Sequence, residues 1–159
     1  AQLILQSSVS ELATIIHDYG EEPYTQAKHL AEIIVANRPY NDTETLAALI
    51  KQHYRGRIGK IHPATRTFQA LRIAVNDELG QIRETLPLLP TLLRAGGRVG
   101  VISFHSLEDR LVKRFFKEQV ENGLEAELHP LTKKPISGAT DDVHNPRSRS
   151  AKLRVAVKK

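Results

Sequence analysis

The sequence contains no cysteine, no methionine and no tryptophan, and only 5% of its residues are aromatic. The lack of cysteine excludes disulfides, thiol catalysis and cysteine-ligated metal, and it is typical of intracellular proteins, so we expect a cytoplasmic location. The shortage of aromatic rings for base stacking argues against a platform that binds single-stranded nucleic acid. Because the chain begins with Ala1 and holds no methionine, we expect a fragment or a processed product.

Other absences exclude further classes of protein. No apolar run approaches the length of a membrane span, and no signal-peptide pattern opens the sequence. The nine glycines form no Gly-x-Gly pair, so the usual turn that brings the backbone close to a cofactor cannot be drawn. None of the seven histidines pairs with another at ligand spacing, and no metal site is predicted. At 159 residues the chain suffices for one domain or two small lobes.

The net charge of +5 is unevenly spread along the chain. Residues 145–159 hold six basic side chains and no acid, whereas the first 144 residues have a net charge of −1. Residues 45–76 also contain no acid, and their six basic residues are Lys51, Arg55, Arg57, Lys60, Arg66 and Arg72. Two basic blocks of this kind favour a nucleic-acid partner, although an ordinary solvated surface explains the charge equally well.

The first sixty residues have helical patterns. Ser8 and Glu11 spell a capping box, and Gly20 ends the helix that follows. Pro23 suits the first position of a second helix, which ends at Asn37 and Pro39. Asp42 or Thr43 can cap a third, and residues 53–60 form its exit loop with Gly56 and Gly59. This part of the chain is therefore predicted to be helical.

A longer helix is predicted from His62 to Leu79, ending at Gly80. Its apolar face holds Phe68, Leu71, Val75 and Leu79. Residues 81–94 are rich in leucine but contain Pro87 and Pro90, which predicts a helix broken near those prolines.

The periodicity changes after Gly96-Gly97. Residues 99–102 form a short apolar run that is typical of a buried parallel strand. Ser106 is then predicted to cap a helix, with Asp109 three residues on and Leu107, Leu111 and Phe115 facing inward. The opposite face carries a basic stripe formed by Arg110, Lys113, Arg114 and Lys117, which is equally consistent with a solvated face.

The last part of the chain is predicted to be a loop followed by a strand. Residues 121–150 are polar and contain Lys133-Lys134-Pro135 and Asn145-Pro146, which are typical of turns. Residues 152–157 alternate charged or small side chains with apolar ones. This pattern predicts a half-exposed strand at or near a sheet edge.

Two longer sequence segments are more specific than the patterns described so far. They are His62-Pro-Ala-Thr-Arg-Thr-Phe-Gln-Ala-Leu-Arg-Ile-Ala-Val-Asn-Asp-Glu-Leu79 and Ile102-Ser-Phe-His-Ser-Leu-Glu-Asp-Arg-Leu-Val-Lys-Arg-Phe-Phe116. Both resemble hallmarks of the RsmH/MraW family of 16S rRNA (cytosine-N4)-methyltransferases. Residues 18–22, 133–135 and 145–151 resemble that family's pattern in the same order. The resemblance covers almost the whole chain and corresponds to the family's C-terminal half.

The resemblance implies an α/β fold: the C-terminal part of a Rossmann-like class I methyltransferase sheet plus an all-helical (SAM-like) insertion domain. Residues 1–80 would form the helical insertion, which helps to recognise RNA, and residues 81–159 the returning part of the catalytic domain. The implied reaction transfers a methyl group from S-adenosylmethionine to a cytidine of 16S rRNA. The family's glycine-rich loop, ribose-binding acid and Asp-Leu-Gly segment have no counterpart here, so the cofactor-binding residues are expected upstream and the isolated chain is expected to be incomplete.

Candidate site residues follow from position and charge. Ser103 and His105 come just after the predicted strand, where open α/β sheets place their ligands, so they are candidates for the vicinity of the active site. The alternative for His105 is a helix-entry residue whose ring bonds a neighbouring backbone group. No general base is identified. The candidate RNA contacts are Arg66, Arg72, Arg110, Lys113, Arg147 and Arg149.

A polar cluster late in the long helix also admits two interpretations. Asn76, Asp77 and Glu78 either contact RNA or the rest of the enzyme, or form a solvated helix end.

Three functions remain open from the sequence. The first is an rRNA methyltransferase fragment whose partners are 16S rRNA and the small ribosomal subunit, with a homodimer possible. The second is a free-standing RNA-binding or assembly module without catalysis. The third, a helix-turn-helix DNA binder, is weaker because no short turn leads into an obvious recognition helix.

Overall fold

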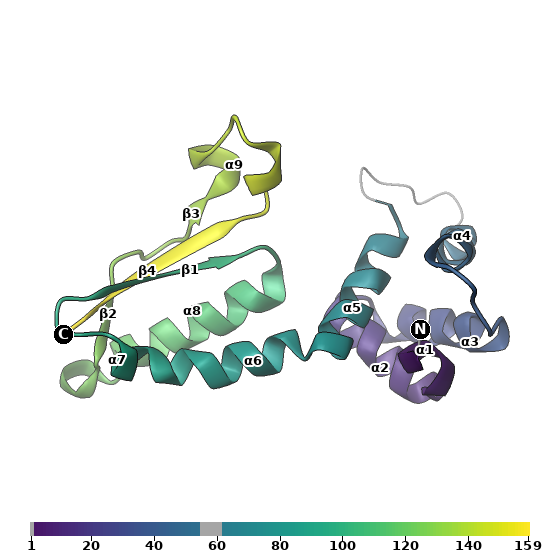
Figure 1. Cartoon of the computed structure of the whole chain (residues 1–159), viewed down its shortest axis with the longest axis horizontal. Coiled ribbons are helices and arrows are strands. Elements are labelled where there is room, and N and C mark those ends of the chain that lie inside the picture. The colour runs from purple at the N-terminus through teal and green to yellow at the C-terminus, as the bar shows by residue number, and fades with distance from the viewer. Residues whose placement is uncertain (1, 55–61) are drawn as a thin grey trace. The chain divides into compact units, whose positions relative to one another are not determined.

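The computed structural model describes residues 2–54 and 62–159 (Figure 1). Most of the predicted exit loop, including Arg55, Arg57 and Lys60, lies outside the described residues. The chain divides into two compact units, Ala1–Glu78 and Leu79–Lys159. Each unit is described by itself. In the part of the chain that the structure describes, no helix is both long and apolar enough to cross a membrane.

The described part of the first unit is built from helices. They are α1 (Gln2–Gln6), α2 (Val9–Gly20), α3 (Tyr24–Ala36), α4 (Thr43–His53) and α5 (Ala64–Asn76). The predicted ends are confirmed at three places: Ser8 and Glu11 form a capping box, α2 ends at Gly20, and the Asp42 side chain accepts a hydrogen bond from the Thr45 N–H. Pro23 precedes α3 and is not its first residue, and α1 was not predicted.

The core of this unit lies where α2 packs against α3 and α5. Its largest fully buried side chains are aliphatic: Leu12, Ile16, Leu30, Ile34, Ile50 and Ile73. On α2 and on α3 the two side chains stand four residues apart, so each of these helices buries one stripe.

The long helix predicted from His62 to Leu79 is two helices. Asp77 adopts a left-handed conformation (φ 49°) and ends α5, and α6 (Glu78–Thr85) starts at the next residue. Gly80 therefore lies inside a helix and does not end one. Val75, predicted on the apolar face, is 65% exposed, because α5 buries Ala70, Leu71 and Ile73.

The second unit combines helices with a small sheet. In chain order its elements after α6 are η1 (Leu86–Leu88), α7 (Leu89–Leu92), β1 (Arg98–Ser103), α8 (Ser106–Glu121), η2 (Gly123–Glu125), β2 (Leu128–Pro130), β3 (Ile136–Ser137), α9 (Gly138–Asp141), η3 (Pro146–Ser148) and β4 (Lys152–Lys158). The predicted break near Pro87 and Pro90 is confirmed, since η1 separates α6 from α7 there. The predicted loop 121–150 contains short strands and helical turns.

Strand β4 is the centre of this sheet. It pairs antiparallel with β1 on one side and with β2 and β3 on the other, in the order β1-β4-β2. Of the predicted position at or near a sheet edge, the first alternative is therefore wrong for β4, whereas its described neighbours β1 and β2 are themselves edge strands. The prediction that β1 is buried was wrong, because only Ser103 of its six residues is buried, and its one described partner is antiparallel, not parallel.

The two faces of the sheet differ in cover. Helix α8 packs on one face, where Val112 and Phe116 meet Val99, Val101 and Ala156. Figure 1 shows α6 and α8 on this same side. The other face is apolar and open: directly paired residues share a face, so Ile102 (59% exposed) lies beside half-buried Leu153. We call this the open face; its further members are the apolar Val155, Val157 and Ile136 and, at its end beside Val157, the exposed Arg98.

Candidate functional site

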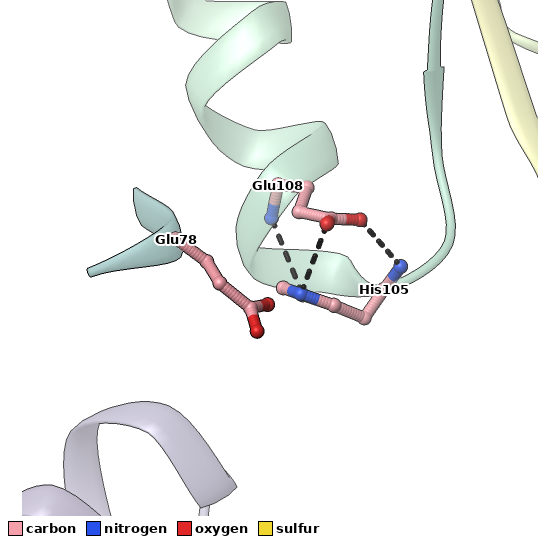
Figure 2. Close-up of side chains that lie close together, drawn as sticks. All are labelled: Glu78, His105 and Glu108. Carbon is pink, nitrogen blue, oxygen red and sulfur yellow. Dashed lines mark hydrogen bonds and ion pairs between the residues drawn. The ribbon is translucent and has the colours of Figure 1, made fainter. Parts of the chain in front are cut away.

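The two predicted active-site candidates are Ser103, the last residue of β1, and His105, in the turn that leads to α8. His105, and not Ser106, is the N-cap of α8: its Nδ1 accepts the Glu108 N–H at 3.4 Å. This confirms the helix-entry interpretation of His105 and corrects the predicted cap. Figure 2 shows the reciprocal half of this capping box, in which the Glu108 carboxylate returns to the His105 N–H. The His105 Nε2 lies 3.3 Å from Glu108 Oε1, without hydrogen-bond geometry.

Glu108 occupies the two backbone N–H groups of the residues that link β1 to α8. Its Oε2 accepts the backbone N–H of Phe104 at 2.7 Å and that of His105 at 3.2 Å. The N-terminal end of a helix ordinarily presents such groups to an anion. Ser103 is 2% exposed and lies on the face that α8 covers, paired with Lys152. Neither candidate therefore offers an open surface in this unit.

A buried ion pair fixes α8 to the sheet. Asp109 accepts hydrogen bonds from Arg154 Nε at 2.7 Å and Nη2 at 3.2 Å, and Lys152 adds a contact at 3.4 Å. Burial raises the pKa of Asp109, but the hydrogen bonds and charges of Arg154 and Lys152 outweigh it and hold this pKa below its ordinary value. Asp109 therefore has a structural partner and is not part of the predicted cap.

The ion pair between Asp109 and Arg154 was not predicted from the sequence. Arg154 in the middle of an apolar strand indicates such a pair, because a buried charge needs a partner on the element that covers the strand.

The basic stripe of α8 is exposed along its length. Arg110, Lys113, Arg114 and Lys117 all face solvent, while Leu107, Val112 and Phe116 are buried. Leu111 and Phe115, predicted to face inward, are only partly buried. Lys117 is engaged with Glu121 at 2.9 Å. The stripe is therefore a real surface feature, and Arg110 and Lys113 stay candidate RNA contacts.

Arg147 and Arg149 lie on an ordered arm that leads from β3 to β4. The Asn145 side chain accepts the Arg147 N–H at 3.2 Å, and the Ser148 hydroxyl donates to the Asn145 carbonyl at 2.8 Å. Gly138 is required here, because any side chain would overlap the Ser148 carbonyl oxygen. Both arginines are exposed, so the arm presents two cations on a fixed backbone.

In the helical unit, Arg66 is engaged with a buried carboxylate. Its guanidinium lies 3.4 Å from Glu22, which is 7% exposed. Tyr54 also contacts Glu22, and burial together with this negative charge raises the pKa of Tyr54 to about 12. The Arg66 side chain is still 62% exposed and can reach a phosphate as well.

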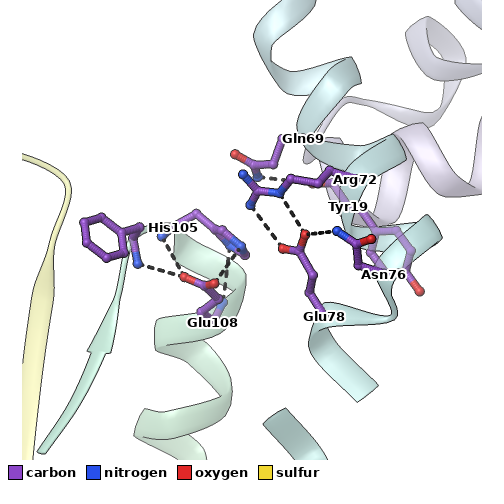
Figure 3. A network of polar contacts seen from close by, with 8 residues as sticks. Tyr19, Gln69, Arg72, Asn76, Glu78, His105 and Glu108 are labelled. Atoms are coloured by element: carbon purple, nitrogen blue, oxygen red, sulfur yellow. Dashed lines mark hydrogen bonds and ion pairs between the residues drawn. The ribbon is translucent and has the colours of Figure 1, made fainter. Parts of the chain in front are cut away.

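Arg72 is held by two hydrogen bonds to Glu78, at 2.8 and 3.1 Å (Figure 3). Asn76 donates to the same carboxylate at 3.2 Å. The polar cluster predicted at residues 76–78 is thus a local network that includes Arg72, with Asp77 ending the helix.

The comparisons with known proteins decide the family. The sequence model of the MraW methylase family matches residues 1–159. The chain belongs to the MraW methylase family. It is 50% identical to the ribosomal RNA small subunit methyltransferase H of Synechocystis over 99% of this chain and 50% of that protein. The proteins of the same name from Acidobacterium capsulatum and Deinococcus radiodurans are 47% and 50% identical, over 100% and 98% of this chain and 52% and 48% of their own length.

This MraW-family chain spans about half the length of the curated relatives it matches. Its mixed helices and strands, with a small antiparallel sheet, are consistent with an α/β methyltransferase.

Proposed function

We propose that this chain is the RNA-binding and sheet-completing part of a methyltransferase that acts on the N4 amino group of a cytidine in 16S rRNA. The relatives' printed name, ribosomal RNA small subunit methyltransferase H, supports an rRNA substrate. The observation that carries the proposal is the family match over the whole chain. The proposed location is the cytoplasm, where small ribosomal subunits are found.

The sheet supports a role as part of a larger fold. Among residues 79–159, β4 is the one described partner of β1, so the other edge of β1 presents backbone N–H and C=O groups without a strand. The open face beside that edge is apolar. An edge and a face of this kind suit addition of further strands and helices, as in a Rossmann-like sheet. The residues that would supply them correspond to the other half of the relatives.

The proposed methyl donor is S-adenosylmethionine, and the residues of this chain do not fit it by themselves. The link between β1 and α8 is Phe104-His105, which contains no glycine, and Glu108 already occupies both backbone N–H groups. Close backbone approach to a cofactor is therefore not available at this turn. We therefore assign cofactor binding to the relatives' other half.

For the rRNA, the chain offers exposed cations in each unit. In the second unit these are Arg110 and Lys113 on α8, and Arg147 and Arg149 on the arm. In the helical unit they are Arg66 and Arg72. Cations on fixed elements position a nucleic acid through its phosphates. We propose that the helical unit acts as the RNA-recognising insertion. We also propose that Ser103 and His105 hold the backbone next to the active site in place and take no part in proton transfer.

Reconstitution tests this function. The chain would be co-expressed with the half of the Synechocystis protein that it does not match, and small subunits lacking the modification would be the substrate. Nucleoside mass spectrometry should find N4-methylcytidine only when both halves are present. Ile102→Asp on the open face should prevent co-purification of the halves, whereas Val120→Asp, at a residue of α8 that is 61% exposed, should not.

Other outcomes have distinct meanings. Methylation at another position of the base would contradict the N4 assignment. A stable complex of the two halves that binds rRNA but transfers no methyl group would support the binding or assembly module instead.

A further inference from the structure

The helical unit contains two neighbouring hollows that share part of their walls. The first, of about 460 Å³, lies between α1, α4 and α5, and the second, of about 410 Å³, lies along the first turns of α5. Phe68 and Arg72 line both of them. Because both residues belong to α5, one face of this helix forms the wall that the two hollows share, which we call the partition.

Each hollow combines an apolar wall with a polar rim. The first has Ile4, Leu46 and Leu71 in its wall and Asn41 and Asn76 at its rim. The second is lined by polar side chains around Phe68; these are His62, Thr65 and Gln69. A nucleobase needs this combination, since its faces are apolar while its edge donates and accepts hydrogen bonds.

The groups of the partition are planar and held in place. Phe68 is half-buried against the core of the unit, and Arg72 is fixed by its two hydrogen bonds to Glu78. Unstacked RNA bases stack on aromatic rings and on guanidinium planes. In the second hollow, His62 Nδ1 accepts the Ala64 N–H at 3.2 Å, so the proton of the neutral ring lies on Nε2, where it can be donated to a base edge.

The charge around the hollows suits a polyanion. Residues 45–76 contain six basic residues and no acid, and three of these cations lie on described helices: Lys51 on α4, and Arg66 and Arg72 on α5. Arg66 and Arg72 pair with Glu22 and Glu78, and Arg72 lines both hollows. Asp42 is an acid at the rim of the first hollow, and its carboxylate is used to cap α4. Such a surface attracts an RNA backbone while it leaves the bases to the hollows.

We propose that the two hollows receive two consecutive unstacked nucleotides of single-stranded RNA, with Phe68 and Arg72 inserted between their bases. This inference rests on the proposed rRNA substrate and adds how the helical unit holds it. The small number of aromatic residues argues against a platform that binds a single strand by stacking many bases, but a single wedge needs only one ring.

The test measures RNA binding by the full chain of 159 residues. Fluorescence anisotropy would follow a labelled single-stranded RNA dodecamer and the same dodecamer annealed to its complement. The single strand should bind at least fivefold more tightly than the duplex. Val75→Asp in the first hollow and Thr65→Asp in the second replace exposed side chains, so both variants should fold. Each should weaken single-strand binding by about 5- to 100-fold, the range expected for loss of one stacked base.

Two controls carry the same change of charge. Thr14→Asp on α2 and Val120→Asp on α8 alter exposed residues outside both hollows and should change the affinity less than twofold. Phe68→Tyr keeps a ring and should retain binding, whereas Phe68→Leu keeps an apolar side chain without the ring and should lose it. Thermal unfolding of the Phe68 variants shows whether a loss of binding is a loss of fold.

The outcomes separate this inference from the proposed function. If Val75→Asp and Thr65→Asp bind like the two controls, or if duplex binds as well as single strand, the hollows are not base sites, whatever the reconstituted enzyme does. If the reconstituted enzyme transfers no methyl group but these variants still lose RNA binding, the methyltransferase proposal fails and the base sites stand.

Discussion

Asp109 on α8 and Arg154 on β4 form a two-point ion pair inside the second unit, with nitrogen–oxygen distances of 2.7 and 3.2 Å. Both side chains are about nine-tenths buried. The pair joins the helix that follows β1 to the central strand of the sheet. It therefore holds together elements that are far apart in the sequence and that border the proposed active site.

Asp109→Asn should destabilise the chain by about 3 to 5 kcal/mol, because it leaves the Arg154 charge buried without a counter-charge. Urea unfolding followed by circular dichroism measures this loss. Lys117→Gln is the matched control, since it removes an exposed pair with Glu121 and should change stability by less than about 1 kcal/mol. Equal effects of the two variants would contradict the structural role of the buried pair.

The same pair predicts a dependence on pH. The pKa of Asp109 is lowered in the folded chain, so the stabilisation from its ionised form is complete above the ordinary carboxyl value of about 4. It is lost as the pH falls through the lowered pKa. The difference in stability between the wild-type chain and Asp109→Asn should therefore shrink below about pH 4. A difference that stays constant down to strong acid would show that the charge of Asp109 does not matter.

His105 should be replaceable by another capping residue. His105→Asn keeps a side-chain acceptor for the Glu108 N–H and should leave stability within about 0.5 kcal/mol, whereas His105→Ala should cost about 1 kcal/mol. In the reconstituted enzyme His105→Asn should keep most of the methyl transfer. A stable His105→Asn variant that is inactive over the whole pH range would instead assign the ring a part in the chemistry.

Some parts of the fold depend only on residues that are neighbours in the sequence. Ser8, Asp42 and the prolines at 87 and 90 act through their own backbone and nearest turn, so their effects were predictable. The end of α5 at Asp77 was not predictable, because no sequence pattern is specific for an aspartate in the left-handed conformation. Gly80 is the residue type that more commonly ends a helix.

Arg147 and Arg149 should contribute phosphate contacts rather than base readout. Arg147→Gln and Arg149→Gln should each weaken RNA binding by a similar factor for different sequences, and each should lower the slope of log affinity against log salt by about 1. Titrations at several salt concentrations measure the slope. Lys159→Gln is the control, because it removes one charge from the same basic block at a residue outside the proposed RNA contacts. A variant that changes sequence preference without changing the slope would contradict this assignment.

His53 should titrate below its ordinary value. Burial lowers its pKa first, and the charge of His29 adds to the effect across ring centroids 4.9 Å apart. Nuclear magnetic resonance titration should show the His53 pKa rising partway, not fully, in His29→Gln, because the burial remains. Since the folded pKa is lowered, the contribution of neutral His53 to stability is present above about pH 6.5 and is lost as the pH falls below it. A His53 pKa unaffected by His29→Gln would exclude the charge contribution.

The sheet and the candidate site were only partly predictable. The strands at residues 99–102 and 152–157 were found from their apolar patterns, but strand direction and order depend on partners distant in sequence. The sequence of an apolar strand does not show whether its neighbours are parallel or antiparallel. β4 was predicted at or near an edge because its alternating charges resemble those of a strand with one solvated face. Arg154 is one of those charges, and only the position of Asp109 in space shows that it points inward.

The central place of β4 also bears on how the chain acquires its structure during synthesis. All the other described strands pair with residues 152–158, so β1, β2 and β3 lack this common partner until that segment emerges from the ribosome. The helices of residues 2–54 and 62–76 are made earlier and depend mainly on contacts among themselves. Translation should therefore yield a folded helical body first and leave the edge of β1 that faces β4 open to chaperones for the time that about fifty further residues take to be added.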